Sequence, residues 1–291
     1  MKAVVLEAHG GRDQLCFKDF PDPVPGPQDV VVKVRACGLN HLDILAREGR
    51  VPVTIPMPHI LGCEVAGQVS AVGEFVKHVK VGQRVAVLTR LSCGRCEHCL
   101  AGEDNICIKA QAVGLAAHGG YAQYLRIPAT NAIPLPDNVS YEDAAGSVMS
   151  MLTAWHMLLG RAGLRPGETL LVIAAGSGIG SAAVQLGRFC GAHVIASASS
   201  DEKLDRAREL GAHHGVNYNR QNLVDEVKRV TGKRGVDVVF EHVGAATFES
   251  SVDCLTRNGR LVTCGAHTGS KVTLDIWKLF AKQISLIGSY L

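Results

Sequence analysis

The sequence predicts an α/β protein in which a mostly β domain precedes a doubly wound parallel sheet. In the first part, short apolar runs such as VVVKVRACG, EVAGQVSAVG and VGQRVAVL alternate with turn residues, as in β domains. From Thr169 onward, apolar strands alternate with helical stretches at a spacing of about 25 residues, which is typical of βαβ units. We therefore expect one domain over residues 1–133 and a second over 134–291.

The composition is that of an ordinary globular protein, with 47% apolar and 20% charged residues in a chain of 291. Thirty basic and 27 acidic residues give a net charge of +3, too small and too evenly spread to indicate a nucleic-acid or membrane partner. No run of about 18 apolar residues occurs, and the opening MKAVVLEAHG reads as a strand and not as a signal peptide. These observations exclude disorder, a membrane span and secretion, and they predict a cytoplasmic protein.

The second domain is predicted element by element. The segment SYEDAAGSVMSMLTAWHMLLGRAG has apolar positions at helical spacing and ends at a glycine, which predicts a helix. The runs TLLVIAA, HVIASA, HGVNY, VDVVFEHV, GRLVTCGA and ISLIGSYL then read as strands. Helices are expected to begin at Gly178, Asp201 and Leu223, and another is expected after VDVVFEHV. Strands connected through helices are expected to pair in parallel.

Four of the ten cysteines fall within fifteen positions, in LSCGRCEHCLAGEDNIC. Clustered cysteines in a chain without a secretion signal indicate a metal site or reactive thiols. Four thiolates bind tetrahedral Zn(II) at about 2.3 Å and leave no open coordination position. We therefore expect one structural zinc ion in a lobe over residues 91–108. Free thiols or an iron–sulfur cluster are the alternatives, although the spacing fits neither common ferredoxin pattern. The predicted ligands are Cys93, Cys96, Cys99 and Cys107.

A turn of small residues, Ala-Gly-Ser-Gly-Ile-Gly over 175–180, joins the strand TLLVIA to the helix SAAVQLGRFCG. Such a turn lets backbone N–H groups and a helix N-terminus approach a pyrophosphate. The G-x-G-x-x-G register is not kept, because Ala175 and Ser177 replace its first two glycines. The preceding strand and following helix nevertheless favour a dinucleotide site. Its expected residues are Gly176, Ser177, Gly178, Ile179 and Gly180.

The end of the next strand, HVIASASSDEK, bears on which dinucleotide binds. An acidic residue there would accept the ribose 2′-hydroxyl and repel a 2′-phosphate. The strand ends in Ser199 and Ser200, with Lys203 close behind, and these groups suit a phosphate. Asp201 and Glu202 are expected in the first turn of the following helix, where they favour the helix dipole. The sequence therefore favours NADP(H) over NAD(H).

Together these features resemble the medium-chain dehydrogenase/reductase superfamily, which contains zinc alcohol dehydrogenases and zinc-free quinone reductases. The resemblance covers essentially the whole chain, with landmarks in GLNHLD, LGCEVAGQV, SCGRCEHC, LRPGETLLV and GVDVVFEHVG. It implies a GroES-like catalytic domain followed by a Rossmann domain. It also implies that Lys203 and Tyr218 hold the 2′-phosphate and that Gly244 and Gly265 border the nicotinamide.

The resemblance also indicates where a catalytic zinc ion would bind. Family alcohol dehydrogenases place its ligands in G-x-C-x-x-D, in G-H-E and before a T-A/V-aromatic helix. The matching positions hold Asn40, Cys63 and Met149, and Leu42 replaces the proton-relay hydroxyl. An amide, a thiol and a thioether are a poor set for zinc. The alternative is a displaced zinc site built from Cys37, His41, His59, Cys63 and Glu64.

This substitution of ligands bears on the reaction. Oxidising an alcohol removes a hydroxyl proton of pKa about 16, which zinc makes feasible. Adding hydride to a carbon–carbon double bond conjugated to a carbonyl gives a delocalised enolate, which hydrogen-bond donors can stabilise. We therefore expect NADPH-dependent reduction of quinones or α,β-unsaturated carbonyls without a catalytic metal. Asn40 would orient or donate to the substrate carbonyl, with Asp43 and Arg47 in support.

Two other functions remain open on the sequence. One is a zinc-dependent alcohol dehydrogenase with an atypical site at Cys63 and Glu64, and the other is a non-catalytic NADPH-binding protein. Family members usually continue past a strand such as IGSYL, so a C-terminal return segment is expected to be missing from this chain. A full-length protein of this kind is expected to form a homodimer or homotetramer.

Overall fold

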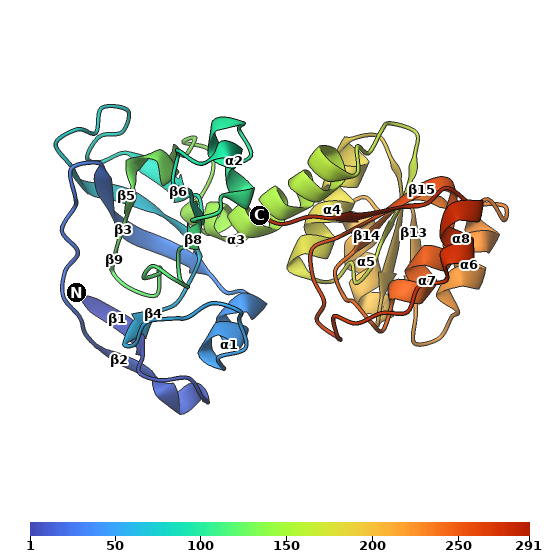
Figure 1. Cartoon of the computed structure of the whole chain (residues 1–291), viewed down its shortest axis with the longest axis horizontal. Helices are drawn as coiled ribbons and strands as arrows, with labels where there is room; N and C mark the ends of the chain where they lie inside the picture. The colour runs from blue at the N-terminus through green and yellow to red at the C-terminus, as the bar shows by residue number, and fades with distance from the viewer. The chain divides into compact units, whose positions relative to one another are not determined.

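The computed structural model describes residues 1–291 and divides the chain into two compact units, 1–149 and 150–291 (Figure 1). The division falls inside helix α3 (Tyr141–Trp155), whereas the sequence pattern places the boundary just before this helix. No helix is long and apolar enough to cross a membrane.

The first unit is built on antiparallel β-sheets. A five-stranded sheet has the order β10-β6-β5-β3-β9, a three-stranded sheet has the order β2-β1-β4, and β7 pairs with β8. The strands are β1 (Lys2–Leu6), β2 (Leu15–Asp19), β3 (Asp29–Gly38), β4 (His59–Ile60), β5 (Glu64–Val72), β6 (Arg84–Val87), β7 (Arg90–Leu91), β8 (Gln111–Ala112), β9 (Tyr124–Pro128) and β10 (Ala132–Pro134). The mostly β domain that the sequence predicts is thereby confirmed.

Alternating side chains of the five-stranded sheet form the core of this unit. Val30 and Val32 on β3, Val65 and Val69 on β5, and Leu125 on β9 are all buried in one apolar cluster. β-Branched residues pack well on a pleated surface, which is why these valine-rich runs form strands. Besides the first part of α3, the helices of this unit are α1 (His41–Arg47), α2 (Glu97–Leu100) and the 3-10 turns η1 (Arg12–Gln14), η2 (Asp104–Ile106) and η3 (Ala129–Asn131).

The second unit contains a six-stranded parallel sheet with the order β13-β12-β11-β14-β15-β16. Its strands are β11 (Thr169–Val172), β12 (His193–Ala198), β13 (His214–Asn217), β14 (Val236–Glu241), β15 (Leu255–Thr263) and β16 (Ser285–Gly288). Its helices are α4 (Gly178–Phe189), α5 (Asp201–Glu209), α6 (Leu223–Val230), α7 (Phe248–Asp253) and α8 (Ile276–Ala281). The predicted strands are all present, and α4, α5 and α6 begin at the predicted residues.

Helices cover both faces of this sheet (Figure 1). Leu170 and Val172 on β11 pack in one apolar cluster with residues of α4 and α5, whereas Leu171 packs in a second cluster with residues of α6 and α7. Alternate side chains of one strand therefore enter two cores, as expected for a doubly wound fold. Because β11 lies between β12 and β14, the direction of winding reverses beside it, and the carboxyl ends of these strands form a topological switch point.

The helix predicted up to the glycine at 163 is present, but its last part is wider than an α-helix. After α3, residues His156–Arg161 form the π-helical turn η4. The Ala162 N–H donates to the Met157 carbonyl five residues earlier, at 2.9 Å. Gly163 then takes a positive φ of 59°, which ends the helix.

Candidate functional site

The small-residue turn after β11 is shaped by Ser177. The Ser177 Oγ accepts a hydrogen bond from the Gly180 N–H at 3.0 Å and donates to the Ala174 carbonyl at 2.9 Å, so it caps the N-terminus of α4. A Cβ on Gly180 would collide with the Ala174 carbonyl and lie 2.9 Å from the Ala175 Cα. Only glycine allows α4 to approach the strand this closely, which is the role of the last glycine in dinucleotide-binding turns.

Lys203 lies over this turn and reaches the end of β12. A Cβ on Gly176 would lie 2.9 Å from the Lys203 Cδ, so the lysine stem packs against the glycine. The Lys203 Nζ donates to the Ser199 Oγ at 3.1 Å. Three of the predicted cofactor-binding residues, Gly176, Ser199 and Lys203, are therefore brought together. Tyr218 follows β13, its N–H donates to the Ala198 carbonyl at 3.1 Å, and its side chain is about half exposed.

The acidic residues beside Lys203 are paired elsewhere. The Asp201 Oδ1 accepts from the Asn217 Nδ2 at 2.7 Å, and its Oδ2 lies 2.6 Å from the Arg220 Nη1. Glu202 forms an ion pair with Arg206 at 2.8 Å. Both acids are in the first turn of α5, as predicted. The Lys203 ammonium thus meets a neutral hydroxyl, while its acidic neighbours are neutralised by arginines. Arg220 is a residue that sequence reasoning missed, because its partner lies 19 positions earlier.

The loops after β14 and β15 approach each other closely at two glycines. Gly244 has a φ of 94°, and a Cβ there would lie 2.6 Å from the Gly269 carbonyl. A Cβ on Gly265 would lie 2.8 Å from the His242 carbonyl. Both predicted positions are therefore glycine for reasons of close backbone approach.

His242 is a buried residue of this region that sequence reasoning missed. Its Nε2 lies 3.1 Å from the Ile173 carbonyl and 3.3 Å from the Ser177 Oγ, so it joins the end of β14 to the turn after β11. Burial, followed by the nearby His267, lowers the pKa of His242 to about 4. The imidazole is therefore neutral near pH 7.

In the first unit, Asp43 fixes the backbone around Asn40. The Asp43 Oδ2 accepts from the Asn40 N–H and from the Tyr121 hydroxyl, both at 2.8 Å, and the Oδ1 accepts from the Gly62 N–H at 3.2 Å. Burial raises the pKa of Asp43, against the effect of these three donors. Asp43 therefore ties the start of α1 to the segment that leads into β5. Tyr121 was not identified from the sequence.

Glu64 is the second acidic group of this network and is only 4% exposed. Its Oε2 accepts from the Asn40 Nδ2 at 2.9 Å, and its Oε1 accepts from the Met149 N–H at 2.7 Å. Two of the three positions at which zinc-dependent relatives are expected to hold the metal are therefore joined through one carboxyl group. A Cβ on Gly38 would lie 2.6 Å from the Glu64 Oε2, so this glycine makes room for it.

The other residues proposed for this site are less closely connected. Cys63 is 1% exposed, and burial, followed by the carboxyl groups of Asp43 and Glu64, raises the pKa of its thiol well above the usual range. Burial likewise raises the pKa of Cys37 to about 12. Arg47 lies in the last turn of α1 and pairs with Glu48 at 2.8 Å, so it supports Asn40 through no direct contact.

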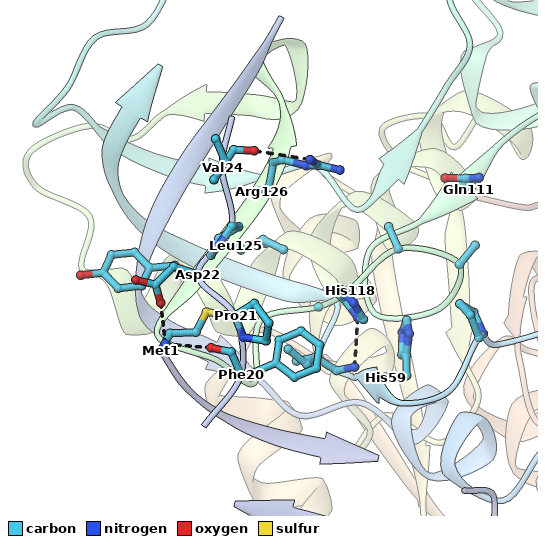
Figure 2. A pocket seen from close by; sticks show the side chains of 17 residues that line it. Met1, Phe20, Pro21, Asp22, Val24, His59, Gln111, His118, Leu125 and Arg126 are labelled. Atoms are coloured by element: carbon cyan, nitrogen blue, oxygen red, sulfur yellow. Dashed lines mark hydrogen bonds and ion pairs between the residues drawn. The ribbon is translucent and has the colours of Figure 1, made fainter. Parts of the chain in front are cut away.

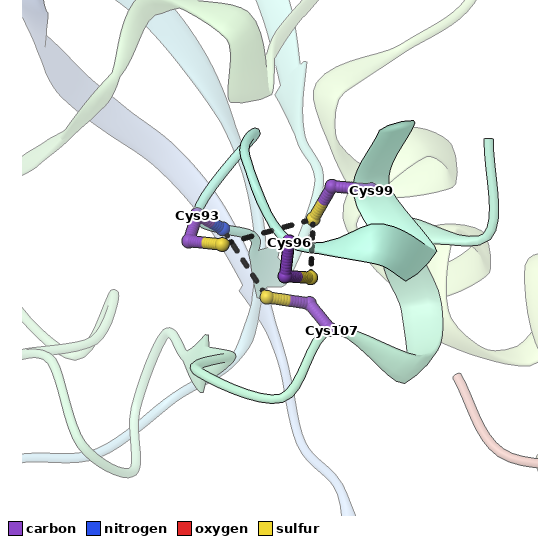
Figure 3. A group of neighbouring side chains, drawn as sticks. All are labelled: Cys93, Cys96, Cys99 and Cys107. Atoms are coloured by element: carbon purple, nitrogen blue, oxygen red, sulfur yellow. Dashed lines mark hydrogen bonds between the residues drawn. The ribbon is translucent and has the colours of Figure 1, made fainter. Parts of the chain in front are cut away.

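The four clustered cysteines converge on one point (Figure 3). Their sulfur atoms all lie within 4.8 Å of one another, with 3.5 Å between Cys96 and Cys99 and 4.0 Å between Cys93 and Cys99. Tetrahedral zinc with bonds of about 2.3 Å requires sulfur atoms about 3.8 Å apart, so the donor set fits. The backbone N–H groups of Cys93 and Lys109 also point at the Cys107 Sγ, at 3.3 and 3.4 Å, and would stabilise a thiolate.

These cysteines form the one group of three or more metal-binding side chains in residues 1–291 whose ligand atoms are so close. The displaced set of Cys37, His41, His59, Cys63 and Glu64 is not gathered in this way. The donors that fit a metal ion therefore lie in the predicted lobe.

A separate cavity of about 510 Å³ also lies in the first unit (Figure 2). His59 and His118 line it, with ring centroids 5.0 Å apart, together with Phe20, Gln111 and Arg126. The His118 Nδ1 accepts from the Ile60 N–H at 3.3 Å. His59 lines this cavity, whereas none of the predicted catalytic residues does.

Comparison with known proteins gives two family matches. Residues 26–137 match the alcohol dehydrogenase GroES-like domain, and residues 178–291 match the zinc-binding dehydrogenase family. An alcohol dehydrogenase from Geobacillus stearothermophilus is 34% identical over 290 residues, covering 99% of this chain and 84% of the relative. A quinone oxidoreductase from Salmonella typhimurium is 34% identical over 291 residues, covering 98% of this chain and 81% of the relative.

Solved structures agree with this assignment. A structure described as an NAD-dependent alcohol dehydrogenase has a TM-score of 0.96 and 45% identity, covering 99% of this chain and 84% of that one. A zinc-binding dehydrogenase from Sinorhizobium meliloti 1021 bound to NADP has a TM-score of 0.90 and 31% identity, with the same coverages. The chain has the domains and fold of an NAD(P)-dependent oxidoreductase, and it belongs to the medium-chain dehydrogenase/reductase superfamily.

Proposed function

We propose that this protein uses NADPH to reduce quinones or α,β-unsaturated carbonyl compounds, without a catalytic metal ion. The observation that carries this proposal is that Glu64 accepts hydrogen bonds from the Asn40 side chain and from the Met149 backbone N–H, at positions where zinc-dependent relatives are expected to bind their metal. An amide, a buried thiol with a raised pKa and a thioether are weak donors for zinc. The Glu64 oxygens already accept hydrogen bonds from the neighbouring positions.

The side chain of Asn40 is suited to the charge that this reaction develops. When bound, NADPH supplies a hydride for the β-carbon of the substrate, and the electron pair of the double bond moves toward the carbonyl oxygen. The Asn40 Nδ2 carries two hydrogens, of which Glu64 accepts one. We propose that the second donates to the enolate oxygen, which is oxyanion stabilisation by a neutral amide. Water then supplies the proton to the α-carbon, which completes the reduction.

The groups at the end of β12 support NADP(H) as the cofactor. Lys203 and Ser199 present an ammonium and a hydroxyl to each other, and the adjacent acids are paired with Arg220 and Arg206. A 2′-phosphate would find charge-assisted donors at this point and no free carboxylate. One solved neighbour is described as NAD-dependent and another is bound to NADP, so the support for NADP(H) comes from the residues of this chain. Tyr218 would lie beside the phosphate.

The four-cysteine lobe supports a single structural zinc ion. With four sulfur ligands the ion would have no open position for substrate, so its contribution would be to hold together a lobe with little apolar core. Cys93, Cys96, Cys99 and Cys107 would be its ligands.

Metal analysis combined with a substrate panel tests the proposal. We expect about one zinc per chain and NADPH oxidation with quinones, enones or enals. Two zinc ions per chain, with alcohol oxidation abolished by Cys63→Ala and no enone reduction, would instead identify an alcohol dehydrogenase with an atypical metal site. NADPH binding without turnover of any panel member would identify a non-catalytic nucleotide-binding protein.

A further inference from the structure

We propose that Glu64 is a positioning residue that fixes the amide of Asn40 in the orientation required to donate to substrate. This inference rests on the proposed reduction of conjugated carbonyl compounds, and it assigns to Glu64 a role in that reaction. Glu64 acts through Asn40 and does not itself touch the substrate.

The orientation follows from the chemistry of the partners. Both Glu64 oxygens accept hydrogen bonds, one from the Asn40 Nδ2 at 2.9 Å and the other from the backbone N–H of Met149 at 2.7 Å. An asparagine amide can be turned by 180° with little change in shape, and only its partners decide which end is nitrogen. Because the Glu64 oxygens act here as acceptors, the nitrogen must face Glu64. Asn40 as a whole is half-buried and therefore not closed off from the surface.

Glu64 is itself held firmly. It is 4% exposed, and its Oε2 occupies the space that Gly38 leaves by lacking a Cβ, since that atom would lie only 2.6 Å away. The Met149 N–H holds the other oxygen. The position of the carboxyl group is therefore fixed, and because it accepts from the Asn40 Nδ2, it also fixes the orientation of the Asn40 amide.

Glu64→Gln tests the inference with almost no change in volume. A glutamine at position 64 has only one side-chain oxygen, and this oxygen accepts from the Met149 N–H. The NH2 group of the glutamine therefore faces Asn40. Asn40 can then turn its oxygen toward the glutamine only by giving up the Asp43 N–H, which its side chain accepts in the capping box of α1. If it does not turn, two NH2 groups face each other, so in both cases the N–H that it offers the substrate is no longer held in place. We expect kcat for enone or quinone reduction to fall about 100-fold, the loss typical of removing one oxyanion donor. KM should change less than about threefold, because the neutral ground-state carbonyl depends less on this donor.

The double variant Asn40→Asp with Glu64→Gln separates positioning from a structural role. The new aspartate accepts from the glutamine NH2, and the Met149 N–H keeps its acceptor, so every hydrogen bond of the network is restored. The aspartate has no N–H to offer the substrate. We expect the unfolding temperature to return to that of the wild type, while kcat remains about 100-fold lower. Asp29→Asn, a carboxyl-to-amide change elsewhere in the first unit, is the control and should leave kcat unchanged.

A spectroscopic measurement makes the test independent of turnover. The side-chain NH2 signals of Asn40, assigned by their loss in Asn40→Asp, should shift in Glu64→Gln and stay in place in Asp29→Asn. If the wild type reduces no enone or quinone, the proposed function is wrong. The amide signals would then still show whether Glu64 orients the Asn40 side chain. The inference is overturned if Glu64→Gln keeps kcat within about threefold of wild type, if its amide signals do not move, or if the double variant recovers activity together with stability.

Discussion

Replacing Lys203 by alanine should weaken the use of NADPH while leaving the use of NADH nearly unchanged. The Lys203 Nζ donates to the neutral Ser199 hydroxyl at 3.1 Å, and the nearest acids, Asp201 and Glu202, form ion pairs with arginines. The ammonium is therefore uncompensated by a carboxylate and available to a 2′-phosphate. A hydrogen bond to a charged group contributes about 1.5–3 kcal/mol, which corresponds to about 10- to 150-fold in kcat/KM.

The lysine stem also packs against Gly176, beside the part of the turn that both cofactors would contact. We therefore allow a loss of up to about threefold with NADH. Initial rates with one quinone substrate and either cofactor measure both effects. Because the groups are exposed, the NADPH effect should shrink at high ionic strength. Lys228→Ala, which removes an exposed lysine from α6, is the matched control. Equal losses with both cofactors, or no loss with NADPH, would refute the reasoning.

Three further predictions concern stability and metal content. His59 and His242 have pKa values lowered to about 4 by burial, so the unfolded chain binds more protons than the folded one between pH 6.5 and 4. The free energy of unfolding should therefore fall with falling pH by about 1.4 kcal/mol per pH unit for each histidine. In His59→Gln the contribution of that histidine to the slope should be absent, which urea denaturation at several pH values measures. Cys96→Ser should reduce the zinc content from about one ion per chain and lower the free energy of unfolding by about 3 kcal/mol. Metal analysis and calorimetry measure these effects, and Cys16→Ser, the control, should change neither quantity. Gly180→Ala should lower the free energy of unfolding by about 1–3 kcal/mol and weaken NADPH binding in a fluorescence titration. Gly146→Ala is the control and should not destabilise the protein, because nothing lies within 4 Å of the new Cβ.

Much of the fold could be predicted because its determinants are local. A strand followed by small residues and a helix is visible in the order of the residues, and α4, α5 and α6 begin at the predicted Gly178, Asp201 and Leu223. The four cysteines lie close enough in the chain for their spacing alone to bring the sulfur atoms together. In each case the interacting groups lie close together in the sequence.

The contacts that give the candidate site its chemistry are not local. Glu64 lies 24 positions after Asn40 and 85 before Met149, and His242 lies 65 after Ser177. The sequence indicated that Asn40 and Met149 are poor zinc ligands, but it could not indicate that one buried carboxyl group would join them.

The amino-acid sequence by itself therefore determined the order of elements, the small-residue turn after β11 and the cysteine lobe, because periodicity and short spacing encode them directly. Only the tertiary structure decided which acid is neutralised by Arg220, which residue holds Asn40 and where the buried histidines lie. Hydrogen bonds between distant segments depend on how β-sheets and loops pack, and no local pattern of residues specifies that packing.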